Sequence, residues 1–335
     1  MRFVIAVVLA LPLYGQVSGF ALLRGSTEDE PVTAQVQAGL DWRPSLTLGA
    51  HVHLLARSDE DGSRRGRVGI VQAWLDQNVV RGEHRFRFME GAFFLPGSRE
   101  NVDALWESPY TISSSALNSW LGEEFRPVGV DASYTLRRRW TVGATAYSGN
   151  DTFGALPAVR GWRLHDRWTL LGEHVPVDAE YFTSVSAETD RRAGWAARGR
   201  WSTDRVSLQV MRIDNRSDAL EYGDLFNWLT RFDIASADVT LGDWTFIAES
   251  GWGFTDIVVE GERFRTGLAT TYVLVSRRLE NGRASLRAET FDNDFGREHA
   301  ITAAYFWSPG KMRLGAEAVV IGEEPRVTVE LRYYF

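Results

Sequence analysis

The 335-residue sequence contains no cysteine. It therefore has no disulfide framework, no thiolate metal site and no cysteine nucleophile. Lysine is almost absent too: Lys311 is the only one, which leaves 36 arginines among the 37 basic residues. Acidic residues number 44, so the net charge is −7, and this balance argues against a nucleic-acid partner.

Long apolar runs are missing from most of the chain, so the sequence predicts no membrane-spanning helix. The exception follows Met1-Arg2, where an apolar run extends from Phe3 to Tyr14. About a dozen residues fit the core of a signal peptide and are too few to span a bilayer. We expect a signal peptide over residues 1–15, with a cleavage site between 15 and 21, and one mature domain over 16–335.

Apolar residues alternate with polar or small residues along nearly the whole mature chain. In the last ten residues Val327, Val329, Leu331, Tyr333 and Phe335 share one face, and the residues between them share the other. A period of two is typical of half-buried strands, and no convincing amphipathic helix of ordinary length is visible. The fold class is therefore all-β.

Two all-β architectures compete, a soluble sandwich or propeller and a membrane barrel, and connection lengths favour the barrel. Along the chain, short connections between predicted strands alternate with longer or more acidic ones. Two of the longer connections, 91–124 and 150–192, are very long. Short turns at one end and long loops at the other are typical of a transmembrane antiparallel β-barrel in the outer membrane. We predict sixteen strands, with fourteen to eighteen as the range, over 17–25, 33–42, 46–57, 66–77, 83–90, 125–135, 140–149, 193–201, 205–214, 227–241, 244–254, 264–276, 283–292, 298–307, 312–321 and 326–335.

Tryptophan placement gives an independent indication. Five tryptophans lie directly beside predicted short turns: Trp42, Trp140, Trp201, Trp244 and Trp307. Tryptophan concentrates at membrane–water boundaries because its ring is apolar while its N–H requires a hydrogen-bond partner. We expect these five to form a membrane girdle at the periplasmic end, whereas a soluble sandwich would place them in its core.

The C-terminal alternation, ending in Tyr333, Tyr334 and Phe335, resembles that of Gram-negative outer-membrane porins. The resemblance implies that Tyr333 and Phe335 belong to an assembly signal read by the barrel-insertion machinery. A weaker, partial resemblance, to porins of the phosphate-selective type, covers Phe88–Pro96, Trp106–Thr111 and Gly122–Glu124. Those channels are often rich in lumen lysines, so the single lysine of this chain does not favour phosphate selectivity.

A sixteen-stranded barrel is wide enough to hold an aqueous channel unless something fills it. Segment 91–124 could fold inward as a constriction loop carrying Glu107, Glu123 and Glu124, together with Glu100 and Asp103. Alternation places Arg85, Arg87, Arg198 and Arg200 on the lumen wall. Loop acids opposite wall arginines would orient and filter polar solutes. An equally weighted reading is that these charges only hydrate a loop and a wet wall.

We expect structural roles for the other notable side chains. The charges of Arg287/Glu289, Arg313/Glu317 and Glu330/Arg332 are expected to form a salt-bridged wall. His51 and His53 share a face but lack a third metal ligand, and His165-Asp166 lacks a marked serine partner. Trp162, Trp168 and the leucines near them should fold into the mouth or against a neighbouring subunit.

The sequence therefore predicts a porin for passive diffusion of small hydrophilic solutes or ions, with no catalytic residue and no cofactor. The alternative is a plugged structural or adhesive barrel, and an outer-membrane hydrolase ranks third. Expected partners are outer-membrane lipid and lipopolysaccharide, the insertion machinery, small polar solutes and two further copies in a homotrimer. Ca²⁺ or Mg²⁺ could bind external acidic loops, namely Glu28-Asp29-Glu30, Asp59-Glu60-Asp61, Asp292/Asp294 and Glu323-Glu324.

Overall fold

The computed structural model describes residues 15–27, 32–58, 68–148, 150–178 and 181–335. The expected signal peptide over 1–15 therefore lies almost entirely outside the described residues. Sixteen long strands form the wall: β1 Gly15–Ser26, β2 Val32–Trp42, β3 Leu48–Arg57, β4 Val68–Arg81, β5 His84–Ala92, β6 Val128–Leu136, β7 Trp140–Ser148, β10 Gly194–Ser202, β11 Val206–Asp214, β14 Leu229–Leu241, β15 Trp244–Val259, β16 Glu262–Leu279, β17 Gly282–Asn293, β18 Gly296–Trp307, β19 Met312–Ile321 and β20 Glu324–Tyr334.

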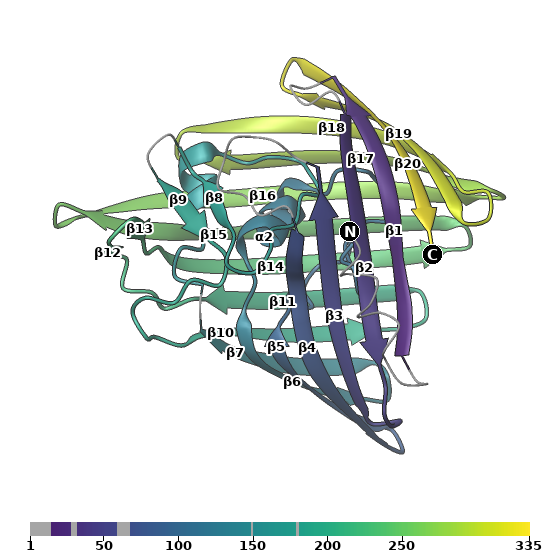
Figure 1. Ribbon diagram of the computed structural model, residues 1–335, viewed down its shortest axis with the longest axis horizontal. Helices are drawn as coiled ribbons and strands as arrows, with labels where there is room; N and C mark the ends of the chain where they lie inside the picture. Colours follow the sequence, from purple (N-terminus) through teal and green to yellow (C-terminus); the bar gives the residue numbers. More distant parts are fainter. Residues whose placement is uncertain (1–14, 28–31, 59–67, 149, 179–180) are drawn as a thin grey trace.

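These strands form one closed antiparallel barrel in chain order, in which β20 returns to pair with β1. In Figure 1 the front strands β1–β4 run across the strands behind them, because the strands of a closed barrel tilt against its axis. The predicted fold class and the predicted number of sixteen strands are confirmed.

Seven connections at one end of the barrel, the short-turn end, are brief: 43–47, 82–83, 137–139, 203–205, 242–243, 280–281 and 308–311. Glycine allows the tight reversal in several of them, as at Gly242, whose φ is +61°. The opposite, long-loop end is more varied than expected. It carries the long segments. However, β15–β20 are joined there by turns of only two residues, at 260–261, 294–295 and 322–323.

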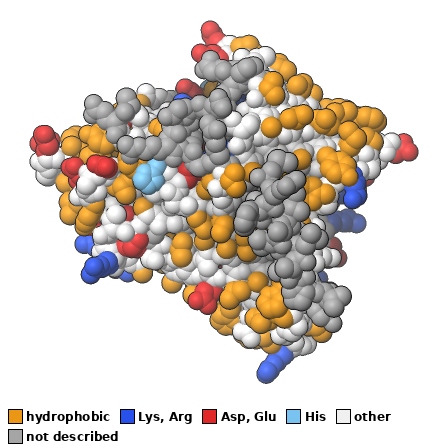
Figure 2. All heavy atoms as spheres, viewed as in Figure 1, with side chains coloured by type: hydrophobic (Ala, Val, Ile, Leu, Met, Phe, Trp, Pro, Cys, Tyr) orange, Lys and Arg blue, Asp and Glu red, His pale blue; other side chains and the backbone are white. Residues whose placement is uncertain are grey.

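The outer surface of the wall is mainly apolar. Outward side chains such as Val142, Val210, Val273, Ile301 and Val329 are all more than half exposed. Figure 2 shows hydrophobic side chains spread over the visible wall, with acidic and basic ones mostly at its margins. A wall that exposes this much apolar surface is suited to contact with lipid rather than water.

Two segments leave the wall and enter the barrel: the first inserted segment, residues 93–127, and the second inserted segment, residues 150–178 and 181–193. The first departs at Gly91, whose φ is +132° and where an added Cβ would lie 2.2 Å from the Ala73 carbonyl oxygen. Only glycine fits such a departure without strain. It contains α2 (Ala116–Glu124), and Figure 1 shows this helix surrounded by the strands of the wall.

The helix α2 was not predicted, because all nine of its residues are buried and no polar face produces a helical period. The second inserted segment contains η1 (Leu156–Arg160) and the small sheet of β8 (His174–Pro176) and β9 (Phe182–Ser184). A further hairpin, β12 (Glu221–Tyr222) with β13 (Leu225–Phe226), follows β11. No helix among the described residues is long and apolar enough to cross a membrane.

Candidate functional site: the barrel lumen

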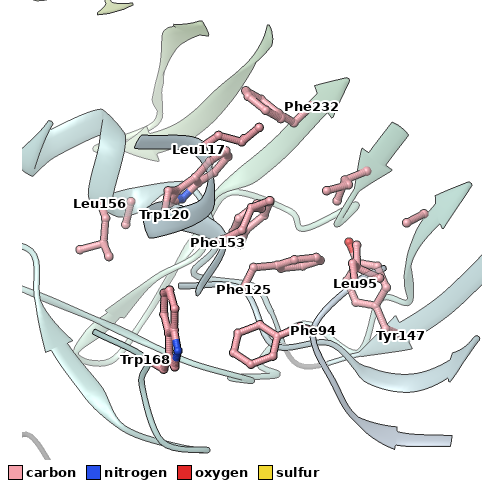
Figure 3. Close-up of a cluster of buried hydrophobic side chains, with 14 of the residues drawn as sticks. Phe94, Leu95, Leu117, Trp120, Phe125, Tyr147, Phe153, Leu156, Trp168 and Phe232 are labelled. Carbon is pink, nitrogen blue, oxygen red and sulfur yellow. The ribbon is translucent and has the colours of Figure 1, made fainter. Parts of the chain in front are cut away.

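An aromatic cluster fills one side of the lumen, and both inserted segments contribute to it (Figure 3). Phe94 stacks on Trp106 with ring centroids 4.2 Å apart, and Trp106 contacts Trp168 edge-on at 5.2 Å. Trp120 of α2 stacks on Phe153 of the second segment at 4.6 Å. Aromatic pairs of this kind add about 0.5–1.5 kcal/mol each to the gain from burial. The two segments thus form one packed body inside the barrel.

Glu123 and Glu124 bind the two inserted segments to each other. Glu123 pairs with Arg160 and with His165, the latter at 2.9 Å. Burial opposes ionisation of Glu123, but Arg160 and His165 together outweigh it and hold its pKa well below the ordinary value. Glu124 accepts from the Trp120 indole N–H at 2.6 Å and from the backbone N–H of Gly154 at 3.0 Å.

The first inserted segment is hydrogen-bonded to opposite sides of the wall. The Gln72 amide on β4 donates to the Ala104 carbonyl at 2.6 Å, and the Gln209 amide on β11 donates to the Gly97 carbonyl at 2.7 Å. Across the lumen Glu317 on β19 accepts from the Ile112 backbone N–H at 2.6 Å. Contacts on both sides fix the segment across the lumen rather than along one wall.

Arg287 on β17 is the most enclosed charge of this attachment, with a side chain 0% exposed. It pairs with Glu100 of the first inserted segment at 2.6 Å and with Glu289 on its own strand at 2.7 Å. It also donates to the Ser113 and Ser114 carbonyls. A buried charge is tolerated only when its hydrogen bonds are completed in this way.

The second inserted segment lies nearer the long-loop end and is held by other strands. Arg57 on β3 donates to the Trp168 carbonyl at 2.9 Å. The Trp162 indole N–H donates to the Asp292 carbonyl on β17 at 2.8 Å. Arg326 on β20 donates to the Leu164 carbonyl at 2.9 Å. Trp168 and Leu164 are buried as a result, so the expectation that this apolar stretch folds into the mouth is confirmed.

Burial extends around the whole inner circumference of the wall. Every wall strand has at least one inward-facing residue that is no more than 5% exposed: Leu22, Gln37, His53, Gln72, Met89, Asp131, Thr145, Ala196, Met211, Ile234, Glu249, Tyr272, Arg287, Thr302, Glu317 and Glu330. In a wide open pore, wall side chains on at least one side would contact water throughout. The lumen is therefore filled at this level.

A cluster of six charges lies where the barrel closes, and we call it the seam cluster. Glu330 on β20 accepts from Arg24 on β1, Arg313 on β19 and the neighbouring Arg332. Each inserted segment adds one acid: Glu107 lies 2.8 Å from Arg332, and Asp166 lies 2.7 Å from Arg24. Three arginines thus face three carboxylates.

The seam cluster keeps some contact with water, unlike most of the filled layer. The side chains of Arg24, Asp166 and Glu107 are 18%, 15% and 11% exposed. Burial raises the pKa of Asp166, but Arg24 and Arg332 outweigh it and hold that pKa below the ordinary value. At Glu107 burial prevails over Arg332 and raises the pKa to about 7. The cluster is a group of charged side chains, three of them slightly exposed, beside an otherwise apolar or tightly bonded filling.

The wall arginines singled out by the sequence have other partners than the loop acids. Arg85 donates to the Asn78 side chain at 2.9 Å and Arg200 to the Ser207 hydroxyl at 2.8 Å. Arg198 pairs with Asp131, a wall residue, at 2.8 Å. All lie on the inner face near the short-turn end. Among the described residues none of these arginines makes an ion pair with Glu107, Glu123 or Glu124, because α2 directs the last two toward the second inserted segment. Their role as pore-lining residues stays a prediction.

Acids of the inserted segments do lie opposite arginines on the wall, but these arginines are Arg24, Arg313 and Arg332. Sequence reasoning missed Arg24 and Asp166 as partners, since residues 142 positions apart carry no shared local pattern. The inward period of β1 and β20 places Arg24 and Arg332 on the lumen face. Their proximity follows only from closure of the barrel, which pairs β1 with β20.

The tryptophans of the expected girdle all point outward at the short-turn end. Trp140 and Trp201 are paired across β7 and β10, with ring centroids 6.3 Å apart. Trp42, Trp140, Trp244 and Trp307 are more than a third exposed. Tyr333 and Phe335 also point outward, and the Phe335 backbone N–H donates to the Gly19 carbonyl on β1 at 3.0 Å.

The histidines expected to be structural have protein partners. His51 pairs with Asp41 at 3.1 Å and His53 with Gln37 at 2.7 Å. Among the external acids, Asp292 pairs with Arg297 and Asp294 accepts from the Gly267 backbone N–H. Glu323 and Glu324 lie at the tight turn between β19 and β20. The acids at 28–30 and 59–61 lie outside the described residues.

Neither a protein-family model nor a curated protein matches this sequence. Solved structures do match in fold. Salmonella typhi OmpF in complex with daunomycin superimposes with a TM-score of 0.60 at 10% identity, covering 96% of this chain and 97% of that one. OmpT of Vibrio cholerae in its trimer form gives 0.60 at 11% identity, covering 96% and 100%. An anion-selective porin from Comamonas acidovorans gives 0.57 at 10% identity, covering 96% and 99%. The chain therefore has the sixteen-stranded porin fold.

Proposed function

We propose that this protein is an outer-membrane channel of restricted conductance, which passes small hydrophilic solutes or ions by diffusion and needs no cofactor or catalysis. The porin fold and the apolar outer wall support a place in the outer membrane. The observation that carries the proposal is the seam cluster, in which the side chains of Arg24, Asp166 and Glu107 keep some exposure beside the filled part of the lumen.

The physical argument rests on what a solute meets in the filled layer. On the side of the aromatic cluster an ion would lose its hydration without compensation, at a cost of several kcal/mol. At the seam cluster three arginines, the carboxylates of Glu330 and Asp166, and Glu107 can replace that hydration. Small ions would cross there when the ion pairs of Glu107 and Asp166 open transiently, and larger solutes would be excluded.

The test is single-channel conductance of the full chain in a planar bilayer. A double variant, Glu107→Gln with Asp166→Asn, keeps the side-chain sizes and weakens the attachment of both segments to the wall. We expect small openings for the wild type and larger or more frequent ones for the variant. Asp292→Asn is the matched control, since its partner Arg297 is exposed outside the lumen, and it should leave the conductance unchanged.

A second function is favoured by the sixteen buried wall residues: a plugged barrel with a structural or adhesive role. In that case neither the wild type nor the double variant would conduct, although both would insert into the bilayer. Persistent absence of current from inserted protein would overturn the channel and leave the plugged barrel.

The remaining expectations follow from the same location. We propose export by the signal peptide over 1–15, a periplasmic girdle of the five outward tryptophans, and contacts with lipopolysaccharide and with two further copies in a homotrimer. Bound Ca²⁺ or Mg²⁺ at the external acids would bridge lipopolysaccharide phosphates.

The outward ring of Phe335 completes the proposed assembly signal. Deleting Phe335 should reduce the amount of protein recovered in the outer membrane, because an apolar girdle residue and the terminal strand pairing are lost together. Recovery at the wild-type level, with heat-modifiable mobility on gels retained, would contradict this role.

A further inference from the structure

Four arginines frame a patch of small side chains on the lumen wall near the short-turn end. Residues paired across β5, β6, β7 and β10 form two parallel rows. One row reads Arg87, Ser133, Gly143 and Arg198, and the other reads Arg85, Thr135, Thr141 and Arg200. Each row therefore has an arginine at both ends and small residues between them. We call this arrangement the arginine frame.

The spacing of the strands separates the backbones of the arginines at the two ends of each row. Neighbouring strands lie about 4.8 Å apart, so the backbones at the two ends of a row are separated by about 14 Å. The floor between them carries the hydroxyls of Ser133, Thr135 and Thr141, of which the last two share a hydrogen bond at 2.9 Å. Arg198 already extends over this floor, since a Cβ added at Gly143 would lie 2.6 Å from its Cζ atom. The glycine is what allows the guanidinium to reach inward.

The charge of the frame is poorly compensated. Of its four arginines only Arg198 makes an ion pair among the residues that the structure describes, with Asp131. Arg87 is near enough to Arg85 and Arg198 for mutual repulsion, with Asp76 and Asp131 as the opposing charges. Arg99 of the first inserted segment repels Arg200, with Asp238 as the opposing charge. Arg85, Arg87, Arg200 and the floor are exposed or half-buried, unlike the filled layer, whereas the Arg198 side chain is only 8% exposed.

We propose that the arginine frame is a binding site for polyvalent oxyanions, small molecules with two or more carboxylate or phosphoryl groups. Guanidinium groups bind such oxygens in a forked geometry, and the hydroxyl floor can donate further hydrogen bonds. Because Arg198 reaches inward over Gly143 and acts on Arg87, more than one guanidinium can approach the same small anion, which favours an anion with several charges over a single halide. The site lies beyond the filled layer, so it is independent of whether the lumen conducts.

The experiment is isothermal titration calorimetry with the folded full chain in detergent micelles. Pyrophosphate and citrate are the probes, and acetate at matched ionic strength is the monovalent control. We expect saturable binding of one or both polyvalent probes and none of acetate. Binding of pyrophosphate alone would assign phosphoryl groups, and binding of citrate alone would assign carboxylates. Absence of saturable binding of either would overturn the site.

Two variants separate a built site from general attraction to a basic surface. Arg87→Gln with Arg200→Gln should weaken binding by at least about tenfold. Gly143→Ala keeps every charge but obstructs Arg198, and it should also weaken binding. Arg297→Gln, which removes an exposed arginine outside the lumen, should have no effect. Folding of each variant is checked by heat-modifiable mobility on gels.

The outcomes are distinguishable from those of the proposed channel. If wild-type protein binds the probes but never conducts, the site stands and the channel fails. If Gly143→Ala binds as the wild type does, or if Arg297→Gln weakens binding as much as the double variant, the attraction is not specific to the frame and the proposal is overturned.

Discussion

Two groups of arginines on the same lumen wall have opposite surroundings. In the seam cluster Arg24, Arg313 and Arg332 share Glu330 and are mostly enclosed by protein. In the arginine frame Arg85, Arg87 and Arg200 make no ion pair among the described residues and face an accessible floor. Both groups come from the same alternation of inward and outward residues. What distinguishes them is whether an inserted segment covers the wall and supplies carboxylates.

Arginines of the seam cluster and of the arginine frame carry the same charge but have different roles. An enclosed arginine with a carboxylate partner holds the filling in place, and removing either partner leaves a buried charge. An accessible arginine without a partner contributes little to stability and much to the local concentration of anions. Substitutions in the seam cluster should therefore affect folding, and those in the arginine frame should affect solutes.

The largest expected effect comes from Glu330→Gln, which removes the acceptor shared by three arginines. Breaking a buried ion pair by loss of one partner costs about 3–5 kcal/mol. We expect the free energy of unfolding in guanidinium to fall by an amount in this range. Arg85→Gln, in the arginine frame, is the control and should change it by less than about 1 kcal/mol. Equal losses would remove the distinction between the two groups.

The second effect concerns pH and Glu107. Burial, together with Asp103 and Glu330, raises the pKa of Glu107 to about 7, while Arg332 and Arg313 act in the opposite direction. The folded state therefore holds this proton more tightly than the unfolded state does. Stability should be highest below the ordinary pKa of 4.5 and fall by up to about 3 kcal/mol as the pH rises to about 7.

Unfolding of wild type and Glu107→Gln, each measured at pH 5 and pH 8, checks this dependence. The variant cannot ionise at this position, so its stability should change less between the two pH values than that of the wild type. Other groups titrate in both proteins, which is why the difference between them is the informative quantity. The same pH dependence in both would show that Glu107 does not hold a proton in the folded state.

The third and smallest expected effect is a change in ion selectivity. Replacing both Arg85 and Arg87 with Glu reverses two accessible charges near the short-turn end. If the protein conducts, the reversal potential under a salt gradient should shift toward cations. The shift should shrink in about 1 M salt, where the Debye length is about 3 Å. Unchanged selectivity at low salt would show that permeating ions do not pass the frame.

The wall of the barrel could be predicted from the sequence, because strand alternation and turn residues are local signals. The sixteen strands and the inward positions of Arg85, Arg87, Arg198 and Arg200 follow from that period. The contents of the lumen could not be predicted in the same way. Glu123 and Glu124 looked like acids facing a pore, yet they bind Arg160, His165 and the backbone at Gly154, which are contacts between two distant segments.

The contacts of the seam cluster could not be predicted from the sequence either. Arg24 and Glu330 are separated by 306 positions, and only closure of the barrel brings them together. The apolar stretch around Trp162 and Trp168 did carry a usable signal, since its hydrophobic side chains could not remain together in water. A sequence thus reveals an apolar segment that cannot remain in a water-exposed loop. It does not reveal which distant residues that segment contacts.

Cysteine labelling tests the central claim, that the lumen is filled by the inserted segments but open to water at the arginine frame. Because the chain has no cysteine, single substitutions report one position each. Ser133→Cys lies on the floor of the frame, Thr270→Cys lies at a buried inward position on β16, and Ser45→Cys in an exposed turn is the reference. With a charged thiol reagent, position 133 should react within about tenfold of the reference rate and position 270 at least about a hundredfold more slowly. Reaction at position 270 as fast as at position 133 would contradict the filled lumen.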